Sequence, residues 1–194
     1  GTPDFVFKKI LSDSGIPYEE SATPVAGKVA LAYASPAVLV PQLRTGAIKY
    51  GVLGEPQVTL ATTGTDNEVL LDLQEKWKEV TQSENIGYPQ VGIVVKTSLL
   101  NNNADLVKAF LAEVEDNAQW ILDNPQEAGE IVKANEGTMP VQLTRGVIEK
   151  CNIRYVDALD AKADIVSYLS VLEDFNSQSI GGSLPNEDFY YSFD

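Results

Sequence analysis

The stretch from Ala34 to Ala61 places a strand pattern between two helix starts with almost no loop, and this order constrains the fold more than any other feature. Ser35-Pro36 joins a residue that can cap a helix to a proline at the first helical position, and Gly46 ends that helix. Glu55-Pro56 opens the next helical turn. Between them lies a short strand pattern of β-branched, aromatic and apolar residues, namely Ile48, Tyr50, Val52 and Leu53. The stretch therefore predicts part of an α/β fold.

The turn from Gly54 to Gln57 is a candidate ligand-binding position. In open α/β sheets, ligands bind beyond the carboxyl ends of the strands, where helix N-termini offer free N–H groups and a partial positive charge. Capping residues and prolines also occur at helix starts that bind nothing, because they satisfy the helix itself. Both interpretations stay open for Ser35-Pro36 and for Glu55-Pro56 when each is taken alone.

The chain begins with a further helix start. Thr2-Pro3-Asp4 predicts an N-cap, a first-position proline and an acid in the first turn, and Gly15-Ile16-Pro17 ends the helix. Tyr18–Thr23 and Lys28–Ala34 are candidate strands. In a complete α/β domain each helix crosses from one strand to the next. An opening helix with no strand before it therefore predicts a lobe that lacks its first strand.

The middle of the chain predicts two more strands and a boundary. A polar loop at Thr62–Asn67 precedes the strand pattern Val69–Leu73, and a second strand pattern covers Val91–Val95. Between these strands, the neighbourhood of Lys76–Lys78 is ambiguous. The segment Ser83–Pro89 is polar and carries glycine and proline, which predicts a crossing between two lobes.

From Asn101 onward the sequence predicts mostly helix. An amphipathic pattern runs to Leu122, Asn124-Pro125 begins a helix that ends near Gly137, and Pro140–Cys151 and Asp160–Phe175 give two more. The residues predicted to face inward are Leu106, Val107, Phe110, Leu111, Val114, Ala118, Ile121, Leu122, Ile165, Tyr168, Leu169, Leu172 and Phe175. The irregular aromatic segment Ser179–Tyr191 is expected to dock onto the domain.

Composition removes several classes of function. The chain has no histidine and one cysteine, so the commonest general base, the usual metal ligand and any internal disulfide are missing. Its 28 acidic and 14 basic residues give a net charge of −14, which disfavours nucleic acids and anionic membranes as partners. No apolar run approaches a membrane span of about 20 residues. We expect no cofactor, no metal and no catalysis, and Cys151 to pack as a small buried hydrophobe.

Three motifs resemble one protein family. They are L..G.I..GVL.EP from Leu43 to Pro56, YPQVGIVVKTSLL from Tyr88, and CNIRY…YL.VL..FN..SIGG.LP..DFYY from Cys151. In this order they resemble the solute-binding proteins of ABC importers, in the branch that takes up nitrate, sulfonates, taurine and thiamine-pyrimidine precursors. The resemblance implies an α/β, type II periplasmic-binding-protein-like fold with two lobes and crossing strands. It places residues 1–87 in the second (middle) lobe, without its opening strand, and residues 88–194 in the return strand and C-terminal helical part of an incomplete first lobe.

The resemblance also implies a function. Such a protein is extracytoplasmic, in the periplasm or on the membrane as a lipoprotein after a signal peptide, and closes on a small polar molecule that it delivers to the membrane subunits of an ABC permease. Exposed strand edges predict self-association of this chain. The expected ligand-binding residues are Gly1, Thr2, Pro3, Ser35, Pro36, Gly54, Glu55, Pro56 and Gln57. Glu55 either holds a ligand amine or complements its own helix dipole.

Two alternatives stay open beside the importer. One is the small-ligand-sensing effector domain of a transcription regulator, which shares the fold; a helix-turn-helix before Gly1 would favour it, whereas a signal peptide with a lipobox cysteine would favour the importer. The other is an enzyme related to the pyrimidine-precursor binders. That enzyme uses its own histidine as a substrate, and this chain has none.

Overall fold

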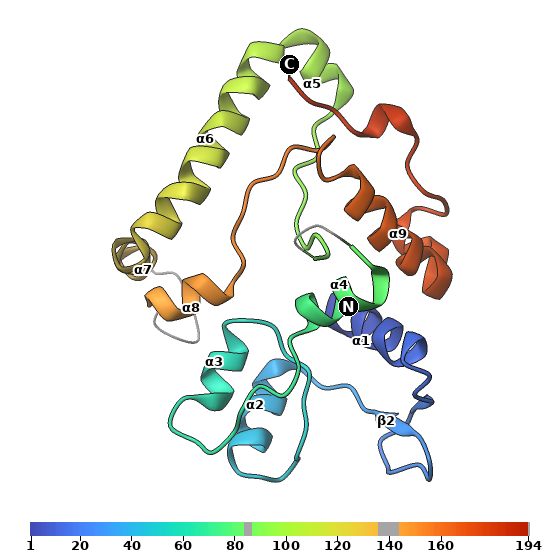
Figure 1. Ribbon diagram of the computed structural model, residues 1–194. Coiled ribbons are helices and arrows are strands. Elements are labelled where there is room, and N and C mark those ends of the chain that lie inside the picture. The colour runs from blue at the N-terminus through green and yellow to red at the C-terminus, as the bar shows by residue number, and fades with distance from the viewer. Residues whose placement is uncertain (84–86, 136–143, 194) are drawn as a thin grey trace.

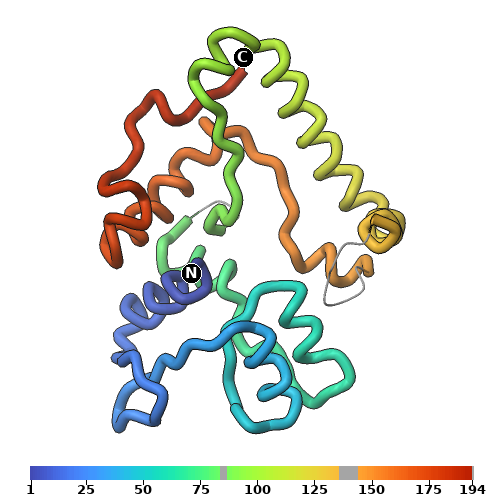
Figure 2. The backbone as a smooth tube through the Cα atoms, turned by 180° about the vertical axis from the view of Figure 1, so that it is seen from behind, coloured from blue at the N-terminus to red at the C-terminus, as the bar shows by residue number. Residues whose placement is uncertain are grey.

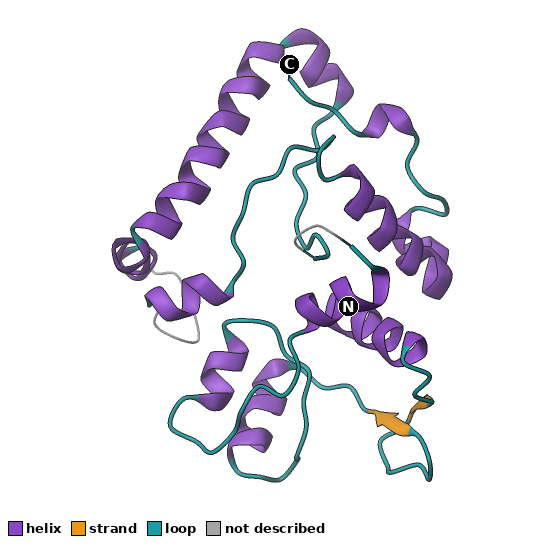
Figure 3. Ribbon diagram, viewed as in Figure 1, coloured by secondary structure: helices purple, strands orange, loops and turns teal. Residues whose placement is uncertain are grey.

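The computed structural model describes residues 1–83, 87–135 and 144–193 (Figure 1). Helices dominate this part of the chain, and its single sheet has two strands (Figure 3). Residues up to 83 gather at one end of the molecule and later residues at the other, as both views show (Figures 1 and 2). The elements are α1 (Thr2–Asp13), β1 (Tyr18–Glu20), β2 (Val29–Leu31), α2 (Pro36–Arg44), α3 (Gln57–Thr62), α4 (Leu73–Thr81), α5 (Thr97–Asn102), α6 (Ala104–Asp123), α7 (Pro125–Ala134), α8 (Arg145–Lys150), α9 (Lys162–Asn176), and the short 3-10 helices η1 (Ser177–Ile180) and η2 (Glu187–Phe189).

Helix α1 begins one residue earlier than the sequence predicts. Gly1, not Thr2, is the N-cap, and its carbonyl accepts from the N–H groups of Asp4 at 3.0 Å and Phe5 at 3.3 Å. Pro3 still lies in the first turn, where a missing N–H costs nothing. The helix ends where predicted, because Gly15 follows with a φ of +66°, a left-handed conformation that glycine adopts without strain.

The two candidate strands after α1 are confirmed, although each is shorter than expected. They pair in parallel, with Tyr18 opposite Val29. Lys8 of α1 reaches this sheet: its ammonium lies 2.7 Å from the Glu20 carboxylate and 3.2 Å from that of Asp4. Lys8 is only 7% exposed, and a buried charge is tolerated only when it is paired. The pair with Asp4 lies within α1, and the contact with Glu20 therefore fixes α1 against β1.

Helices α2 and α3 lie side by side at the lower end of the molecule (Figure 1). Arg44, the last residue of α2, donates from Nη1 to the carbonyl oxygens of Leu60 at 2.6 Å and Thr63 at 2.9 Å. Asn67, in the predicted polar loop, donates from Nδ2 to the carbonyl of Leu43 at 3.2 Å. A side chain at the end of α2 thus binds the backbone at the end of α3, and one in the loop after α3 binds the backbone of α2, so the pair is held as a unit.

Helix α4 covers the ambiguous neighbourhood of Lys76–Lys78. One Asp72 carboxylate oxygen accepts from the N–H groups of Gln74 at 2.8 Å and Glu75 at 3.2 Å. An aspartate followed three residues later by a glutamate resembles a capping-box signal, so the sequence does carry a mark of this helix start. Trp77 is 1% exposed and faces the core.

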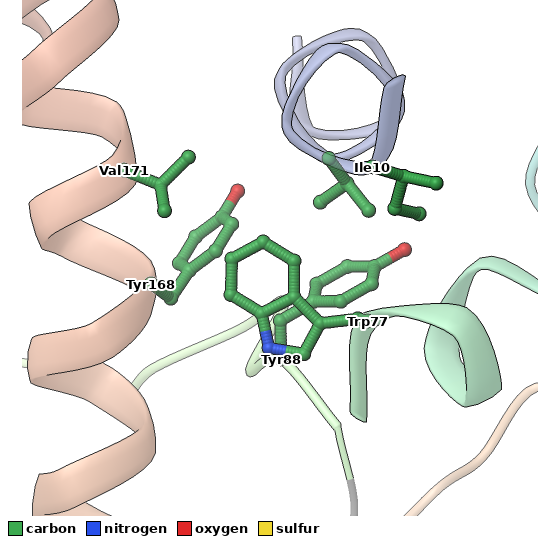
Figure 4. Packing of buried hydrophobic residues seen from close by; sticks show 6 residues of the cluster. Ile10, Trp77, Tyr88, Tyr168 and Val171 are labelled. Carbon is green, nitrogen blue, oxygen red and sulfur yellow. The ribbon is translucent and has the colours of Figure 1, made fainter. Parts of the chain in front are cut away.

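The hydrophobic core joins α1, α4 and α9 (Figure 4). The Trp77 ring meets the rings of Tyr88 and Tyr168 edge-on at centroid distances of 5.5 and 6.0 Å, and the two tyrosines stack at 5.7 Å. Burial raises the pKa of Tyr88 to about 12, and the nearby Tyr168 and Asp72 add to this. The buried members of the core are Val6, Ile10, Trp77, Tyr88, Tyr168 and Val171. Both ends of the molecule contribute to it.

Three predicted strands are wrong. Residues 48–53, 69–73 and 91–95 form no strand in the described chain, and side chains such as Tyr50 and Val91 are 76% and 90% exposed. A strand needs a hydrogen-bonded neighbour, and the described residues supply none along these segments. A strong strand pattern is therefore not sufficient for a strand here.

The later helices follow the predictions more closely. Helices α6, α7 and α9 are confirmed. Helix α7 ends at Ala134, and its expected end, Gly137, lies outside the described residues. The expected start of α8, Pro140, lies outside them too. So do residues 84–86 of the predicted lobe crossing. Helix α8 is described from Arg145.

The predicted inward faces are only partly correct. In α6, Val107 is 5% exposed, but Leu106 and Phe110 are 62% and 52% exposed, because no described element covers that side of the helix. In α9, Tyr168 is buried as predicted, whereas Phe175 is 36% exposed. The aromatic segment after α9 docks as expected, through a buried residue, Tyr190.

Candidate functional site

The first helix start, Gly1–Pro3, is held from the opposite end of the chain. Tyr168 of α9 donates its hydroxyl proton to Thr2 Oγ1 at 2.9 Å. Gly1 is exposed, and Thr2 and Pro3 are half-buried. Thr2 accepts one hydrogen bond through its oxygen and keeps its own proton to donate.

The second helix start, Ser35-Pro36, is exposed. Helix α2 begins at Pro36 as predicted, and the Ser35 carbonyl accepts from the N–H of Val38 at 2.9 Å. The predicted side-chain cap is wrong, because the Ser35 hydroxyl makes no capping hydrogen bond. An exposed hydroxyl pays no desolvation cost that would force it onto the helix. It therefore remains open to other partners.

Tyr33 connects the first two helix starts. Its hydroxyl donates to the Asp4 carboxylate at 3.1 Å, and its ring lies 5.5 Å from the Lys8 ammonium, within the range of a cation–π contact. Because Tyr33 precedes Ser35 by two residues, this contact holds the second start beside the first turn of α1.

The charges around Tyr33 stabilise one another. Burial alone lowers the pKa of Lys8, but hydrogen bonds with Glu20, Tyr33 and Asp4 outweigh it and hold the pKa above its ordinary value. Lys8 in turn lowers the pKa of Glu20, and Tyr33 adds to that effect. Lys8 is therefore a cation and Glu20 an anion throughout the neutral pH range.

The third helix start, Gly54–Gln57, is capped by its own glutamate. Helix α3 begins at Gln57, and Glu55 Oε2 accepts from the N–H of Thr59 at 3.0 Å. The carboxylate satisfies a free donor of the first turn and complements the helix dipole. This is one of the two roles expected for Glu55. Of the others, Gly54 is exposed and Pro56 is half-buried.

Cys151, at the end of α8, lies near this third start. Burial raises the pKa of its thiol, and the negative charge of Glu55 raises it further. The side chain is half-buried, which agrees in part with the expected packing as a small hydrophobe. A thiol in this setting stays protonated and unreactive at neutral pH.

The three starts are brought together unequally. The first and second starts are linked through neighbouring residues, by the hydrogen bond from Tyr33 to Asp4. Among the described residues, no hydrogen bond or ion pair joins Gly54–Gln57 to either of them. Helix α3 is instead held to α2 at its C-terminal end, where Arg44 donates to the carbonyls of Leu60 and Thr63. Together the starts offer hydroxyl donors, backbone N–H groups and one carboxylate, which suits the binding of a small polar molecule.

No described group of histidine, cysteine, aspartate or glutamate side chains is arranged to hold a metal ion. Within the described ranges, no helix is both long and apolar enough to cross a membrane.

Two hollows in the described part of the chain lie away from these starts. One, of about 390 Å³, lies between α6 and the segment before α9, and its lining includes Lys108, Glu115 and Tyr155. A second, of about 580 Å³, is a shallow hollow along the start of α9. Neither contains a predicted site residue, so neither supports the predicted ligand position.

Sequence reasoning missed the side chains that hold the site in place. Tyr168 and Thr2 are 166 positions apart in the chain, and Tyr33 and Asp4 are 29 apart. Pattern analysis finds local periodicity and caps, and neither contact leaves a local signal of that kind.

Comparison with known proteins supports the resemblance. Residues 44–128 match a family described as NMT1/THI5 like, and this range contains the third helix start. No curated protein matches the chain. Among solved structures, an ABC transporter from Parabacteroides distasonis is similar over 99% of this chain, with a TM-score of 0.77 and 21% sequence identity. This chain spans 63% of the length of that one.

These findings confirm the expected fold class, an α/β fold of the type II periplasmic-binding-protein kind, although few of its strands are paired here. They also confirm the resemblance noted in the sequence, at the motif that ends in Glu55-Pro56. Residues 44–128 are therefore similar to the NMT1/THI5-like family, and the fold of the chain is similar to that of an ABC transporter protein.

Proposed function

We propose that this chain belongs to the solute-binding component of an ABC importer, which captures a small polar molecule and delivers it to the permease. The observation that carries the proposal is the structural similarity to an ABC transporter over 99% of the chain, at a TM-score of 0.77. The NMT1/THI5-like match over residues 44–128 supports the same class. In this role the protein works outside the cytoplasm, in the periplasm or as a lipoprotein, and performs no catalysis.

The proposed ligand position is the set of three helix starts. Thr2 and Ser35 donate hydrogen bonds from their hydroxyls. At the third start Gly54 and Glu55 donate from their backbone N–H groups, since the N–H groups of Gln57 and Thr59 already bond to the Gly54 carbonyl and the Glu55 carboxylate. Glu55 accepts from a ligand amine with the carboxylate that now caps α3. Support comes from the unused Ser35 hydroxyl and from the Tyr33–Asp4 link, which holds two of the starts in place.

In this proposal, residues 1–87 and 88–194 are the two lobes. The aromatic core and a hydrogen bond from Ser83 to the Asp164 carboxylate at 3.0 Å support a junction between them. A ligand that contacts both lobes stabilises the closed arrangement only by its higher affinity for it. Copies of the chain associate through the exposed segments that carry strand patterns.

Calorimetric titration with nitrate, taurine and a thiamine-pyrimidine precursor tests the proposal. We expect saturable one-to-one binding of one of these probes. Ser35→Ala should weaken that binding by about 0.5–1.5 kcal/mol, the usual worth of a hydrogen bond. Ser12→Ala, at an exposed position late in α1, is the matched control and should leave affinity unchanged. Absence of saturable binding for all three probes would overturn the proposal.

A further inference from the structure

We infer that Tyr168 is a positioning residue of the proposed site, which orients the Thr2 hydroxyl and couples it to the packing of α9. The inference rests on the proposed function, because it supposes that Thr2 contacts a ligand. Tyr168 itself lies in the core and not at the surface: it is 8% exposed.

The ring of Tyr168 is fixed on two sides. It stacks on Tyr88 at 5.7 Å with an interplanar angle of 22°, and it meets the edge of Trp77 at 6.0 Å (Figure 4). A ring held in this way has little freedom to rotate, so its hydroxyl is delivered to one place. That place is Thr2 Oγ1, at 2.9 Å.

The direction of this hydrogen bond decides what Thr2 can do. Because Tyr168 donates, Thr2 uses one lone pair of its oxygen to accept, and its own proton points elsewhere. Among the described residues, the Thr2 hydroxyl donates no hydrogen bond that would use that proton or fix the rotor. Tyr168 therefore preorganises Thr2 as a donor, which lowers the entropy that a ligand must remove on binding.

The same face of α9 makes a second contact with the early part of the chain. Asp164 lies one helical turn before Tyr168, and its carboxylate accepts from the Ser83 hydroxyl at 3.0 Å. Residues four apart on α9 thus hold the start of α1 and the segment after α4. Ligand contact at Thr2 and the placement of α9 are then linked, because each stabilises the arrangement that the other requires.

Amide hydrogen exchange tests the positioning role without any ligand. Tyr168→Phe keeps the stacked ring and removes only the hydroxyl. We expect the N–H groups of Asp4 and Phe5, which bond to the Gly1 carbonyl, to exchange about 3- to 10-fold faster in this variant. Tyr190→Phe is the matched control, because Tyr190 is 6% exposed and its buried hydroxyl has no hydrogen-bond partner in the described chain. Exchange at Asp4 and Phe5 as slow in Tyr168→Phe as in the wild type would overturn the inference.

Binding of the best of the three probes tests the coupling to Thr2. Tyr168→Phe should weaken binding about 3- to 10-fold, Thr2→Val should weaken it at least as much, and the double variant should bind like Thr2→Val alone. Thr2→Ser, which keeps the hydroxyl, should retain the sensitivity to Tyr168→Phe. Losses that multiply in the double variant would overturn the coupling. If the wild type binds no probe, the proposed function fails, and the exchange rates alone decide the role of Tyr168.

Discussion

The residues around the helix starts are of two kinds. Some use their polar groups to hold the fold together, and others have polar groups that can still bind a further partner. The Lys8 ammonium is buried among Asp4, Glu20 and the Tyr33 ring, all of which belong to the fold. Among the described residues, the side chains of Thr2 and Glu55 each make one hydrogen bond, yet a hydroxyl and a carboxylate can each make more. Substitution of Lys8 should therefore affect stability, and substitution of Glu55 should affect ligand binding.

Glu55→Gln should weaken binding of the best probe by about 1–3 kcal/mol, as expected for loss of a charge-assisted hydrogen bond. Calorimetry of the variant and the wild type measures this difference. Glu68→Gln, an exposed change a few residues past α3, is the control. Unchanged affinity together with a slightly lower melting temperature would limit Glu55 to capping α3.

Lys8→Met should lower the free energy of unfolding by about 1–3 kcal/mol, because it leaves the Asp4 carboxylate without its cation. Lys9→Met, which breaks the more exposed pair with Asp13, should cost only about 0.3–0.5 kcal/mol. Urea denaturation at pH 7 measures both. Equal losses in the two variants would contradict the structural role of Lys8.

The contribution of Lys8 to the free energy of unfolding should become smaller as the pH falls. The folded state lowers the pKa of Glu20, so the contact stabilises the fold above the ordinary glutamate pKa of about 4.3 and is lost as pH falls below it. The difference in free energy of unfolding between the wild type and Lys8→Met should therefore become smaller in acid. A difference that stays constant from pH 7 to pH 3 would show that Glu20 does not respond to Lys8.

At the scale of elements, the sequence predicts helices well and strands poorly, and the reason is physical. A helix satisfies its backbone within itself, so caps such as Asn124-Pro125 and breaks such as Gly15 locate it locally. A strand needs a partner that may lie anywhere in the chain. Residues 91–95 have the apolar pattern of a strand but no described neighbour, so the pattern alone misleads.

In the candidate site, too, the locally determined features are predictable from the sequence and the long-range contacts are not. Proline, glycine and capping residues predict the three helix starts, and helices do begin at or within one residue of each. The contacts that orient them were not found, because Tyr168 reaches Thr2 only through the tertiary packing of α9 on α1. Helix caps depend on residues that are close together in the sequence, whereas the orientation of the helix starts depends on how the core packs.

Trp77→Ala should destabilise the protein by about 3–5 kcal/mol, because Trp77 is 1% exposed and joins α4 to the rings from the rest of the core. Trp120→Ala, at a half-buried position on α6, should cost clearly less. Chemical denaturation followed by far-ultraviolet circular dichroism compares the two. A larger loss of stability for Trp120→Ala would show that the main core lies beside α6 and contradict this prediction.

At the scale of the whole molecule, the exposed apolar side chains of residues 91–94 lie in a segment whose first charge is Lys96. Uncharged apolar segments with unpaired backbone groups favour association between copies. The net charge of −14 opposes association, but it is screened in salt.

Val94→Lys should therefore shift the chain toward monomer, since it places a charge at a position 77% exposed in the proposed contact. Ile16→Lys, in the turn after α1, is the control and should leave the mass distribution unchanged. Light scattering across a concentration series in 0.15 M salt measures the effect. A wild-type chain that is monomeric at every concentration would contradict self-association.

The most direct measurement of the central claim is an NMR titration of isotope-labelled chain with the best-binding probe, read as shifts of assigned amide resonances. The account predicts saturable shifts concentrated at Thr2, at Ser35 and at Glu55 with Gln57, the residues of the three helix starts. Small or no shifts are expected around Lys108 and Tyr155, which line the separate hollow beside α6. Saturable shifts confined to that hollow, with the helix starts unmoved, would contradict the assignment of the ligand position.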